Sequence, residues 1–283
     1  MLNMPVVDAH VHLLDPANLS TPWLADIAAL NRRFDVQDFG HAADDLPIEK
    51  IVCVEAGCAP HEHLREVEWV VHLAQQNRQI AGVVAFADLL DTATLDATLD
   101  ALSAHALVCG IRHNIQFHEK GFCLQDDFVR GVNKVAAKGW PFEICITHDQ
   151  MDEAVELVGR CPEAQFVLDH CGKPNIADTV IDPWQSQIER LAALPNIVCK
   201  ISGLLTEADL SQWSEDDIRP YVAHAAACFG AERVMYGGDW PVLTLAGAYR
   251  DWFELTLRLT DDWSHSAREA FYYRNAARVY RLA

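Results

Sequence analysis

Short apolar runs alternate with longer segments of helical periodicity along the whole chain, and this alternation constrains the fold more than any other feature. The runs are short and rich in β-branched residues, as buried strands are. Because a helix-like segment follows most of them, the pattern predicts parallel strands joined by helical crossovers. The predicted strands are Val6–His12, Lys50–Ala56, Ile80–Asp88, Val108–Gln116, Pro141–Thr147, Gln165–His170, Ile197–Gly203 and Arg233–Asp239.

The segments between these runs repeat their apolar residues at a spacing near that of an amphipathic helix. Helices are expected at His63–Gln76, Thr94–Ala104, Asp127–Lys138, Gln150–Gly159, Pro183–Leu194 and Glu215–Phe229, and helical patterns at Leu245–Leu259 and Ser264–Leu282 close the chain. Eight such units in 283 residues predict one α/β domain over residues 1–283, a closed (β/α)8 TIM-like barrel. Two long loops, Leu13–Arg33 and Cys171–Asp182, are expected to shape its pocket.

Composition argues against several classes of function. The formal net charge is −19, and only 22 Lys and Arg residues are spread over the chain, so no nucleic-acid partner is expected. No apolar run approaches the ~20 residues of a membrane helix. The segment Met1–Pro5 lacks the features of a secretory signal, so we expect a cytoplasmic protein with no membrane partner. The sequence leaves the oligomeric state open.

The nine cysteines are odd in number and show no C-x-x-C spacing. This pattern favours reduced, structural thiols over disulfides or a cysteine zinc site. If one cysteine were a nucleophile, Cys171 would be the best candidate, because it directly follows His170.

Nearly every predicted strand ends in a titratable or polar side chain. In a barrel these ends meet at the C-terminal face, where active sites lie. Each residue also has an ordinary structural explanation, such as a turn cap for Asp239. Their convergence is much harder to attribute to chance than any one of them. In chain order they are His10 and His12, Glu55, Asp88, Arg112 and His113, Thr147 and His148, His170, Lys200 and Ser202, and Asp239.

His10 and His12 are two residues apart in a predicted strand, so both imidazoles lie on one face. Two such rings can hold one metal ion. Closure of a barrel makes its first and last strands neighbours, which brings Asp239 beside the pair. An H-x-H pair alone is a weak signal, because strand histidines also occur on the surface or hydrogen-bonded in the core. Lys200 and Arg112 are harder to dismiss, because a buried cation without a partner is costly.

Several motifs resemble those of the amidohydrolase superfamily, and within it the branch of sugar lactonases and dicarboxylate lactonases. They extend from Asp8 to Tyr280, so the resemblance covers essentially the whole chain. Together they are specific to the branch, which includes fuconolactonases and rhamnonolactonases, but they do not select a substrate. The motifs are Asp8-Ala9-His10-Val11-His12, Gly110-Ile111-Arg112-His113, Asp169-His170-Cys171-Gly172-Lys173-Pro174, Cys199 to Ala208, Gly237-Gly238-Asp239-Trp240-Pro241 and Asn275 to Tyr280.

The resemblance implies a hydrolase that opens a lactone ring to a hydroxy acid, with the site inside the C-terminal ends of the strands. It also implies one divalent metal ion, with zinc as the first choice and a metal-free site as the alternative. The family's ligands carry over to His10, His12 and Asp239, and its histidine after the sixth strand carries over to His170. His148 lies near the place of a fifth-strand ligand, but its surroundings do not match, so its role stays open.

The fourth strand offers Arg112 and His113 where two-metal members of the superfamily carry a carbamylated lysine, which favours one metal or none. In this interpretation Asp239 is the general base and His170 either completes the metal shell or hydrogen-bonds the developing oxyanion. The expected substrate is an aldonolactone, such as a fuconolactone or rhamnonolactone. The predicted substrate-binding residues are Arg112, Lys200, His113, Trp23 and Trp240, with Glu207 as a further candidate.

Three alternatives belong to other classes. A metal-independent lactonase for a dicarboxylate lactone would need several arginines, and Arg112 alone stands clearly at a strand end. A metal-dependent decarboxylase of the same superfamily would use a similar ligand set and would release carbon dioxide instead of acid. A non-catalytic sugar-acid-binding protein would be expected to lack part of the constellation, which is complete here.

Overall fold

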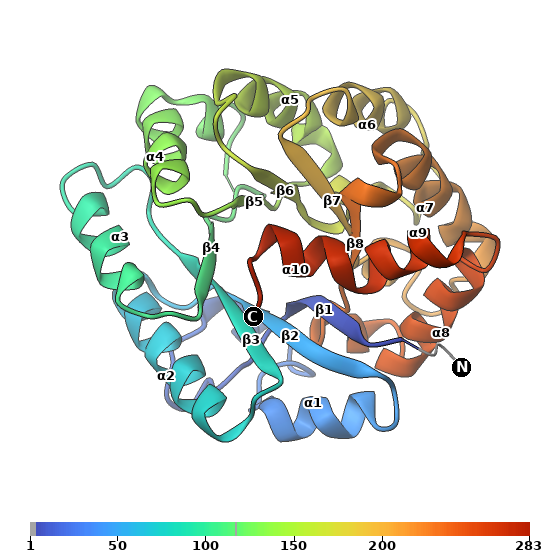
Figure 1. Ribbon diagram of the computed structural model, residues 1–283, viewed down its shortest axis with the longest axis horizontal. Helices are drawn as coiled ribbons and strands as arrows, with labels where there is room; N and C mark the ends of the chain where they lie inside the picture. The colour runs from blue at the N-terminus through green and yellow to red at the C-terminus, as the bar shows by residue number, and fades with distance from the viewer. Residues whose placement is uncertain (1–3, 117) are drawn as a thin grey trace.

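The apolar runs form one parallel sheet in the computed structural model, which describes residues 4–116 and 118–283 (Figure 1). Within these residues the sheet has eight strands, and their spatial order follows the chain from β1 to β8. The predicted barrel is thus confirmed. Every strand ends before its predicted last residue, because the polar residues there belong to loops. The strands are β1 (Val6–Val11), β2 (Ile48–Val54), β3 (Ile80–Phe86), β4 (Val108–Arg112), β5 (Phe142–Ile144), β6 (Phe166–Leu168), β7 (Ile197–Ile201) and β8 (Val234–Tyr236).

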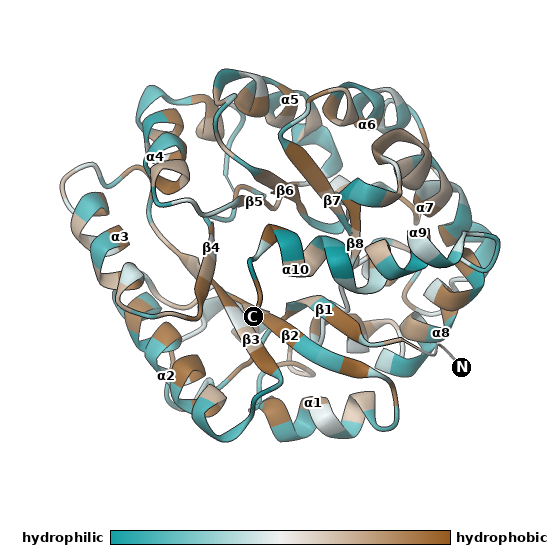
Figure 2. Cartoon of the chain, viewed as in Figure 1, coloured by the Kyte–Doolittle hydropathy of each residue, from teal (hydrophilic) through white to brown (hydrophobic). Residues whose placement is uncertain are grey.

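Helices surround the sheet, and their apolar faces turn toward it (Figures 1 and 2). The sequence pattern predicted all of those below except α1, a short helix that begins after an Asp35 capping box. In the described part of the chain, no helix combines the length and the apolar content that a membrane crossing requires. The helices are α1 (Val36–Ala43), α2 (His63–Gln76), α3 (Leu95–Ser103), α4 (Asp126–Ala137), α5 (Met151–Arg160), α6 (Trp184–Ala192), α7 (Glu215–Phe229) and α8 (Tyr249–Leu259).

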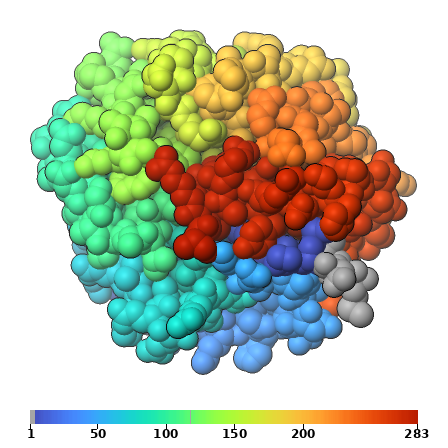
Figure 3. All heavy atoms as spheres, viewed as in Figure 1, coloured from blue at the N-terminus to red at the C-terminus, as the bar shows by residue number. Residues whose placement is uncertain are grey.

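The C-terminal segment crosses the N-terminal mouth of the barrel (Figures 1 and 3). It was predicted as one helix over Ser264–Leu282, but it consists of α9 (His265–Glu269), a π-helical turn over Ala270–Arg274 and α10 (Asn275–Val279). Its apolar side chains pack against the interior of the sheet and close the barrel at its N-terminal mouth. This inner cluster contains Val7, Ala9, Val52, Val54, Val84, Val167, Val198 and Met235 from the strands, together with Ala276, Val279 and Tyr280.

The barrel closes between the ends of β8 and β1, and this closure positions the candidate site. The Asp239 N–H donates to the His10 carbonyl oxygen at 2.7 Å, and the His12 N–H donates to the Trp240 carbonyl oxygen at 2.7 Å. Val11 and Trp240 form the corresponding parallel bridge. The same hydrogen bonds that complete the sheet therefore place the backbone of Asp239 beside that of His10.

Candidate active site

Four side chains from the C-terminal ends of β1, β6 and β8 meet at one point of the barrel. The Nε2 atoms of His10 and His12 lie 3.1 Å apart. Asp239 Oδ1 lies 3.7 Å from Nε2 of His10 and 3.6 Å from Nε2 of His12. It also lies 4.0 Å from Nε2 of His170. All four residues are buried, so three imidazole nitrogens and one carboxylate oxygen face one another. We call these four residues the His/Asp cluster.

Hydrogen bonds on the far side of two rings turn their Nε2 atoms toward the cluster. Nδ1 of His12 lies 3.0 Å from the carbonyl oxygen of Val54. Because a carbonyl can only accept, Nδ1 carries the proton and Nε2 of the neutral ring keeps its lone pair. Nδ1 of His170 lies 2.9 Å from Oγ of Ser202. Contacts of this kind orient metal-binding histidines in proteins.

The third ring, that of His10, rests on buried charged residues. Its Nδ1 lies 3.1 Å from Nζ of Lys200 and 3.4 Å from Oδ1 of Asp169. Arg112 donates from Nη1 to Oδ2 of Asp169 at 3.2 Å and from Nε to Oε1 of Glu55 at 2.7 Å. Opposite charges therefore alternate beneath the cluster, as buried ions require.

Burial and close neighbours set the ionisation of the cluster. Burial lowers the pKa of His170 to about 4, against the effect of Asp239. Burial and then Lys200 hold the pKa of His10 well below its ordinary value. Burial alone would raise the pKa of Asp239, but the imidazoles of His170, His12 and His10 lower it below its ordinary value. Near neutral pH the site thus offers the Asp239 carboxylate with the neutral imidazoles of His10 and His170, the forms that bind metals.

This donor set fits one divalent ion. Zinc binds imidazole nitrogen and carboxylate oxygen at about 2.0–2.2 Å, so neighbouring ligand atoms of a tetrahedral site lie roughly 3.3 Å apart. The four separations given above, from 3.1 to 4.0 Å, lie on both sides of this value. His10, His170 and Asp239 also form a group whose possible ligand atoms lie within 4.8 Å of one another. The structure therefore holds a buried His/Asp cluster consistent with a divalent metal.

A cavity of about 200 Å³ opens onto the cluster. Its Trp23 and Ile27 come from the long loop after β1, and its Lys173 comes from the long loop after β6, so both loops shape the pocket as predicted. The volume is at the small end for ligand pockets, which favours a compact substrate. The lining residues are His12, Trp23, Ile27, Ala56, Gly57, Arg112, Asn114, Gln116, Cys145, His170, Lys173, Asp239 and Val242.

Part of this lining is polar and carries a cation. Lys173 donates from Nζ to Oε1 of Gln116 at 2.7 Å and lies 3.8 Å from Oε1 of Glu207. Burial works against its charge, yet Cys145 and Glu207 nearby raise the pKa of Lys173 above its ordinary value. Asn114 adds a further amide to the lining. The cavity therefore presents both donors and acceptors to a hydroxylated ligand.

The turn that carries His170 and Lys173 adopts left-handed backbone. The φ angles of His170, Cys171 and Lys173 are 55°, 52° and 51°, and that of Gly172 is 72°. Non-glycine residues in this region cost about 1–2 kcal/mol each. Hydrogen bonds hold the turn in place, from the Lys173 N–H to the His170 carbonyl at 2.8 Å and from Trp184 Nε1 to the Cys171 carbonyl at 2.8 Å. Such local strain is common at functional sites.

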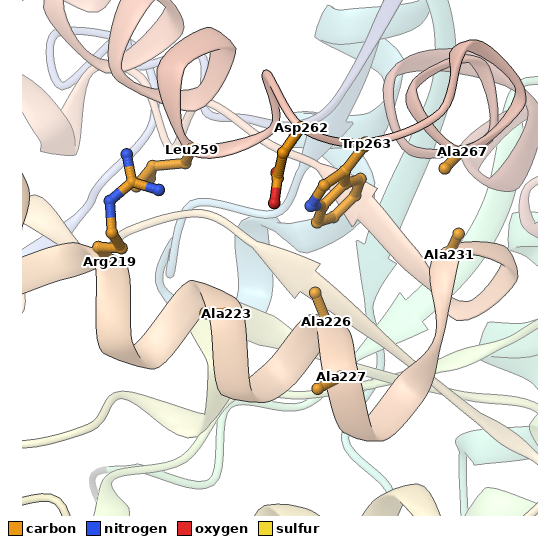
Figure 4. Close-up of a pocket in the computed structure, with 9 residues that line it drawn as sticks. All are labelled: Arg219, Ala223, Ala226, Ala227, Ala231, Leu259, Asp262, Trp263 and Ala267. Carbon is orange, nitrogen blue, oxygen red and sulfur yellow. The ribbon is translucent and has the colours of Figure 1, made fainter.

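A larger groove of about 380 Å³ lies on the outside of the barrel, between α7 and the segment that joins α8 to α9 (Figure 4). Small alanine side chains form most of its lining, and no residue of the His/Asp cluster contributes to it. The cavity over the cluster is therefore the candidate active site. The groove is lined by Arg219, Ala223, Ala226, Ala227, Ala231, Leu259, Asp262, Trp263 and Ala267.

The sequence profile of the amidohydrolase family matches residues 7–282, which include every strand end described above. The chain belongs to the amidohydrolase family. Among curated relatives, the L-fucono-1,5-lactonase of Burkholderia multivorans is 29% identical in an alignment of 294 positions that covers 98% of this chain and 96% of that protein. The L-fucono-1,5-lactonase of Burkholderia ambifaria is 28% identical in an alignment of 286 positions that covers 98% of this chain and 95% of that protein.

Solved structures of the family share the same architecture. A crystal structure of an amidohydrolase from Burkholderia multivorans with bound zinc superposes with a TM-score of 0.89. Its sequence is 29% identical to this amidohydrolase, and the match covers 99% of this chain and 100% of the other.

The structure brings together the four residues that the sequence predicted as metal ligands. His10, His12, His170 and Asp239 share one site, while their individual roles stay predictions. Arg112 lines the cavity as expected, although its guanidinium also bonds two buried carboxylates.

Three residues that the sequence predicted to bind substrate do not belong to the cavity lining, and their substrate-binding roles stay predictions. Lys200 is fully buried beneath His10. The ring of His113 lies in an aromatic cluster, where its Nδ1 accepts a hydrogen bond from the Leu89 N–H at 3.2 Å. The Trp240 indole is also buried and packs edge-on against phenylalanine rings. Of the two predicted tryptophans, only Trp23 lines the cavity.

The cavity lining also contains residues that were not predicted from the sequence. Lys173 lies three residues after His170 in the motif Asp169 to Pro174, so its closeness to a predicted ligand could have identified it as a site residue. Gln116 and Cys145 lie at or just beyond strand ends, but their polarity alone did not indicate that they line the cavity. His148 is exposed and opens a 3-10 turn instead. Cys171 is buried outside the lining, with its sulfur 3.8 Å from that of a second cysteine, so the geometry gives no support to a nucleophilic role.

Proposed function

We propose that this protein hydrolyses the lactone of a sugar acid, an aldonolactone, to the open hydroxy acid. The observation that carries the proposal is the placement of the Asp239 carboxylate, among three imidazole nitrogens, at a small cavity with polar lining. The curated relatives named as lactonases support lactone hydrolysis as the class of reaction.

A lactone is a cyclic ester, so its hydrolysis needs an activated water, a polarised carbonyl and a proton for the departing ring oxygen. A divalent ion held by His10, His12, His170 and Asp239 would supply Lewis acidity toward the carbonyl and would increase the acidity of water at the site. Asp239 accepts a proton from the attacking water as the new C–O bond forms. It then returns that proton to the ring oxygen as the old C–O bond breaks.

The cavity lining supports a neutral, hydroxylated substrate. The amides of Asn114 and Gln116 and the ammonium of Lys173 match ring hydroxyls and the carbonyl, and the Trp23 ring suits the apolar face of a sugar. A dicarboxylate would need several free cations. Among the described lining residues, the cations are Arg112, which already bonds Glu55 and Asp169, and Lys173.

The test is a screen of aldonolactones, including the 1,5-lactone of fuconate and the lactones of rhamnonate, with a pH indicator and with or without added Zn²⁺ or Mn²⁺. Acid release that exceeds the spontaneous rate is expected for at least one lactone. If the metal-loaded protein opens none of them, the proposal is wrong. Carbon dioxide release from aromatic acids would instead favour the decarboxylase alternative.

Within this reaction, Asp239→Asn should keep the fold and lose roughly 10²–10⁴-fold in turnover, the usual contribution of a general base. Asparagine tolerates the left-handed backbone of Asp239, whose φ is 56°. Asp96→Asn, at an exposed aspartate on α3, serves as the matched control and should be unchanged. Turnover of Asp239→Asn near the wild-type rate would refute the base assignment.

A further inference from the structure

The closing motif of the chain, Asn275 to Tyr280, contains α10, which crosses one mouth of the barrel (Figure 1). The cavity lies at the other mouth, where the strands have their C-terminal ends. Asn275 donates from Nδ2 to the carbonyl oxygens of Ala231 and Val234, both at 2.7 Å. These bonds fix the start of α10 at the beginning of β8. Val279 then packs with the inner apolar cluster, so α10 is anchored across the N-terminal mouth and its end points into the barrel.

From the end of this helix the side chain of Tyr280 enters the interior, where it is 2% exposed. Its hydroxyl donates a hydrogen bond to Oε1 of Glu143 on β5. The same oxygen accepts a hydrogen bond from Nζ of Lys200 at 2.7 Å. Oε2 of Glu143 has no hydrogen-bond partner among the residues that the structure describes. Tyr280 and Lys200 therefore hold one carboxylate from two sides.

Lys200 continues the connection to the His/Asp cluster. Its Nζ lies 3.1 Å from Nδ1 of His10 and 3.1 Å from Oδ1 of Asp169. The two carboxylates, Glu143 and Asp169, are the acceptors for this ammonium group, and Oδ1 of Asp169 also faces Nδ1 of His10 at 3.4 Å. When Nδ1 of His10 carries the ring proton toward Asp169, Nε2 keeps its lone pair. Lys200 is fully buried, so water cannot replace a partner that moves away. A continuous series of contacts thus runs from Tyr280 through Glu143, Lys200 and Asp169 to His10.

We propose that Tyr280 is a positioning residue for the metal site. Its hydroxyl holds Glu143, which holds the ammonium of Lys200 beside Asp169, and Oδ1 of Asp169 in turn faces Nδ1 of His10. This support fixes the His10 ring with Nε2 toward the cluster. The proposal requires that the cluster binds a metal, which is part of the proposed function, but it does not depend on which lactone is opened.

The experiment measures metal binding by the full-length Tyr280→Phe variant. We expect about tenfold weaker Zn²⁺ binding in competition with a chromophoric chelator, the lower end of the range for outer partners of metal ligands. The visible spectrum of the Co²⁺-loaded variant should also shift, because the ligand geometry changes. Wild-type Zn²⁺ affinity together with a wild-type Co²⁺ spectrum would overturn the proposal.

The matched control is Tyr272→Phe. Tyr272 is a fully buried tyrosine of the same C-terminal segment, and its hydroxyl contacts Thr256 and Thr260, both at 3.2 Å. It should lose stability without any change in Zn²⁺ affinity or Co²⁺ spectrum. If both tyrosine variants weaken Zn²⁺ binding equally, the effect is general loosening of the segment and the proposal fails.

A second variant, Glu143→Gln, tests the route and covers the case in which Tyr280→Phe does not fold. It should weaken Zn²⁺ binding at least as much as Tyr280→Phe, and the double variant should bind no more weakly than Glu143→Gln alone. Independent, multiplying losses would show that the hydroxyl does not act through Glu143. Zn²⁺ binding without any lactone hydrolysis would overturn the proposed function and leave this inference intact.

Discussion

Glu66 on α2 is a buried carboxyl that makes no ion pair within the described residues, and we predict that Glu66→Gln stabilises the protein. Oε1 of Glu66 accepts hydrogen bonds from the Ala56 N–H at 2.8 Å and from the Cys58 thiol at 3.4 Å, while Oε2 has no partner in the described part of the chain. Burial, with Glu55 adding repulsion, raises the pKa of Glu66 from 4.5 to about 8. The folded protein therefore holds Glu66 protonated near neutral pH.

The magnitude follows from the protons that each state binds. Between pH 4.5 and about 8 the folded chain holds one proton that the unfolded chain releases, so the free energy of unfolding decreases as pH rises. At about 1.4 kcal/mol per pH unit, the penalty is about 3 kcal/mol at pH 7 and about 5 kcal/mol well above pH 8. Below pH 4.5 it vanishes. Glutamine keeps the acceptor for Ala56 and carries no charge, so Glu66→Gln should recover most of this penalty.

The assay is urea unfolding of the metal-free protein at pH 5, 6, 7 and 8. The stability difference between Glu66→Gln and wild type should be under about 1 kcal/mol at pH 5 and should grow by roughly 1.4 kcal/mol per unit up to pH 7. Glu68→Gln, at an exposed position of the same helix, should show no such growth. A gain that is independent of pH, or a loss at pH 8, would refute the reasoning.

Three further predictions test the site and its surroundings. Gly203→Ala should lose most Zn²⁺ affinity and turnover, because Gly203 has a φ of +61° and its new Cβ would lie 2.5 Å from Nδ1 of His170. The control Gly159→Ala should bind Zn²⁺ normally, because nothing lies within 4 Å of its new Cβ. Trp23→Phe should raise KM with little change in Tm. Trp240→Phe, at a buried position, should cost about 1–3 kcal/mol of stability with a smaller effect on KM. The reverse result would contradict the assignment of Trp23 to the cavity wall. Zn²⁺ at 100 times its Kd should raise the free energy of unfolding by about 2.7 kcal/mol, and a calorimetric Tm that does not respond to Zn²⁺ would show that the folded protein does not bind it.

The barrel was predictable because its signal is local and repeated. Each strand is an apolar run that is buried on both faces, and each predicted helix has a clear apolar stripe. The missed helix α1 has eight residues, and only three of them, Val36, Phe39 and Ala43, are buried. That stripe is too short for periodicity to detect. Its one readable signal was the Asp35 capping box.

The ligand set was predictable because it follows from strand geometry and closure. His10 and His12 share a face at a spacing of two, and closure brings Asp239 to them. The same alternation limits the other predictions, because adjacent residues of an extended chain point to opposite sides. Arg112, the last residue of β4, therefore faces the cavity, while its neighbour His113 packs among phenylalanine rings outside it. Alternation therefore argues against a prediction that places both adjacent residues of such a pair in the cavity.

Depth along the barrel axis was not predictable from the order of strand ends. Lys200 lies two residues before Ser202 on the same side of the chain, and inward residues two positions apart occupy successive layers. Ser202 reaches His170 at the cluster, whereas Lys200 lies below His10. The alternation of residues predicts which side chains of a strand face inward. The position of each side chain along the barrel axis depends on the stagger between strands, which only the assembled sheet determines.

The layer below the cluster contains charged groups where most barrels have branched apolar side chains. Buried ion pairs usually contribute less stability than apolar residues of the same volume, so this layer is costly for the fold alone. Its charges have a consequence for the cluster above. Burial and then Asp169 raise the pKa of Glu143 to about 7. Above that pH the five side chains carry one negative charge in excess, and the Asp239 carboxylate adds a second. A divalent cation is the ligand that balances this excess, and a neutral lactone adds no further charge. The layer consists of Glu55, Arg112, Glu143, Asp169 and Lys200.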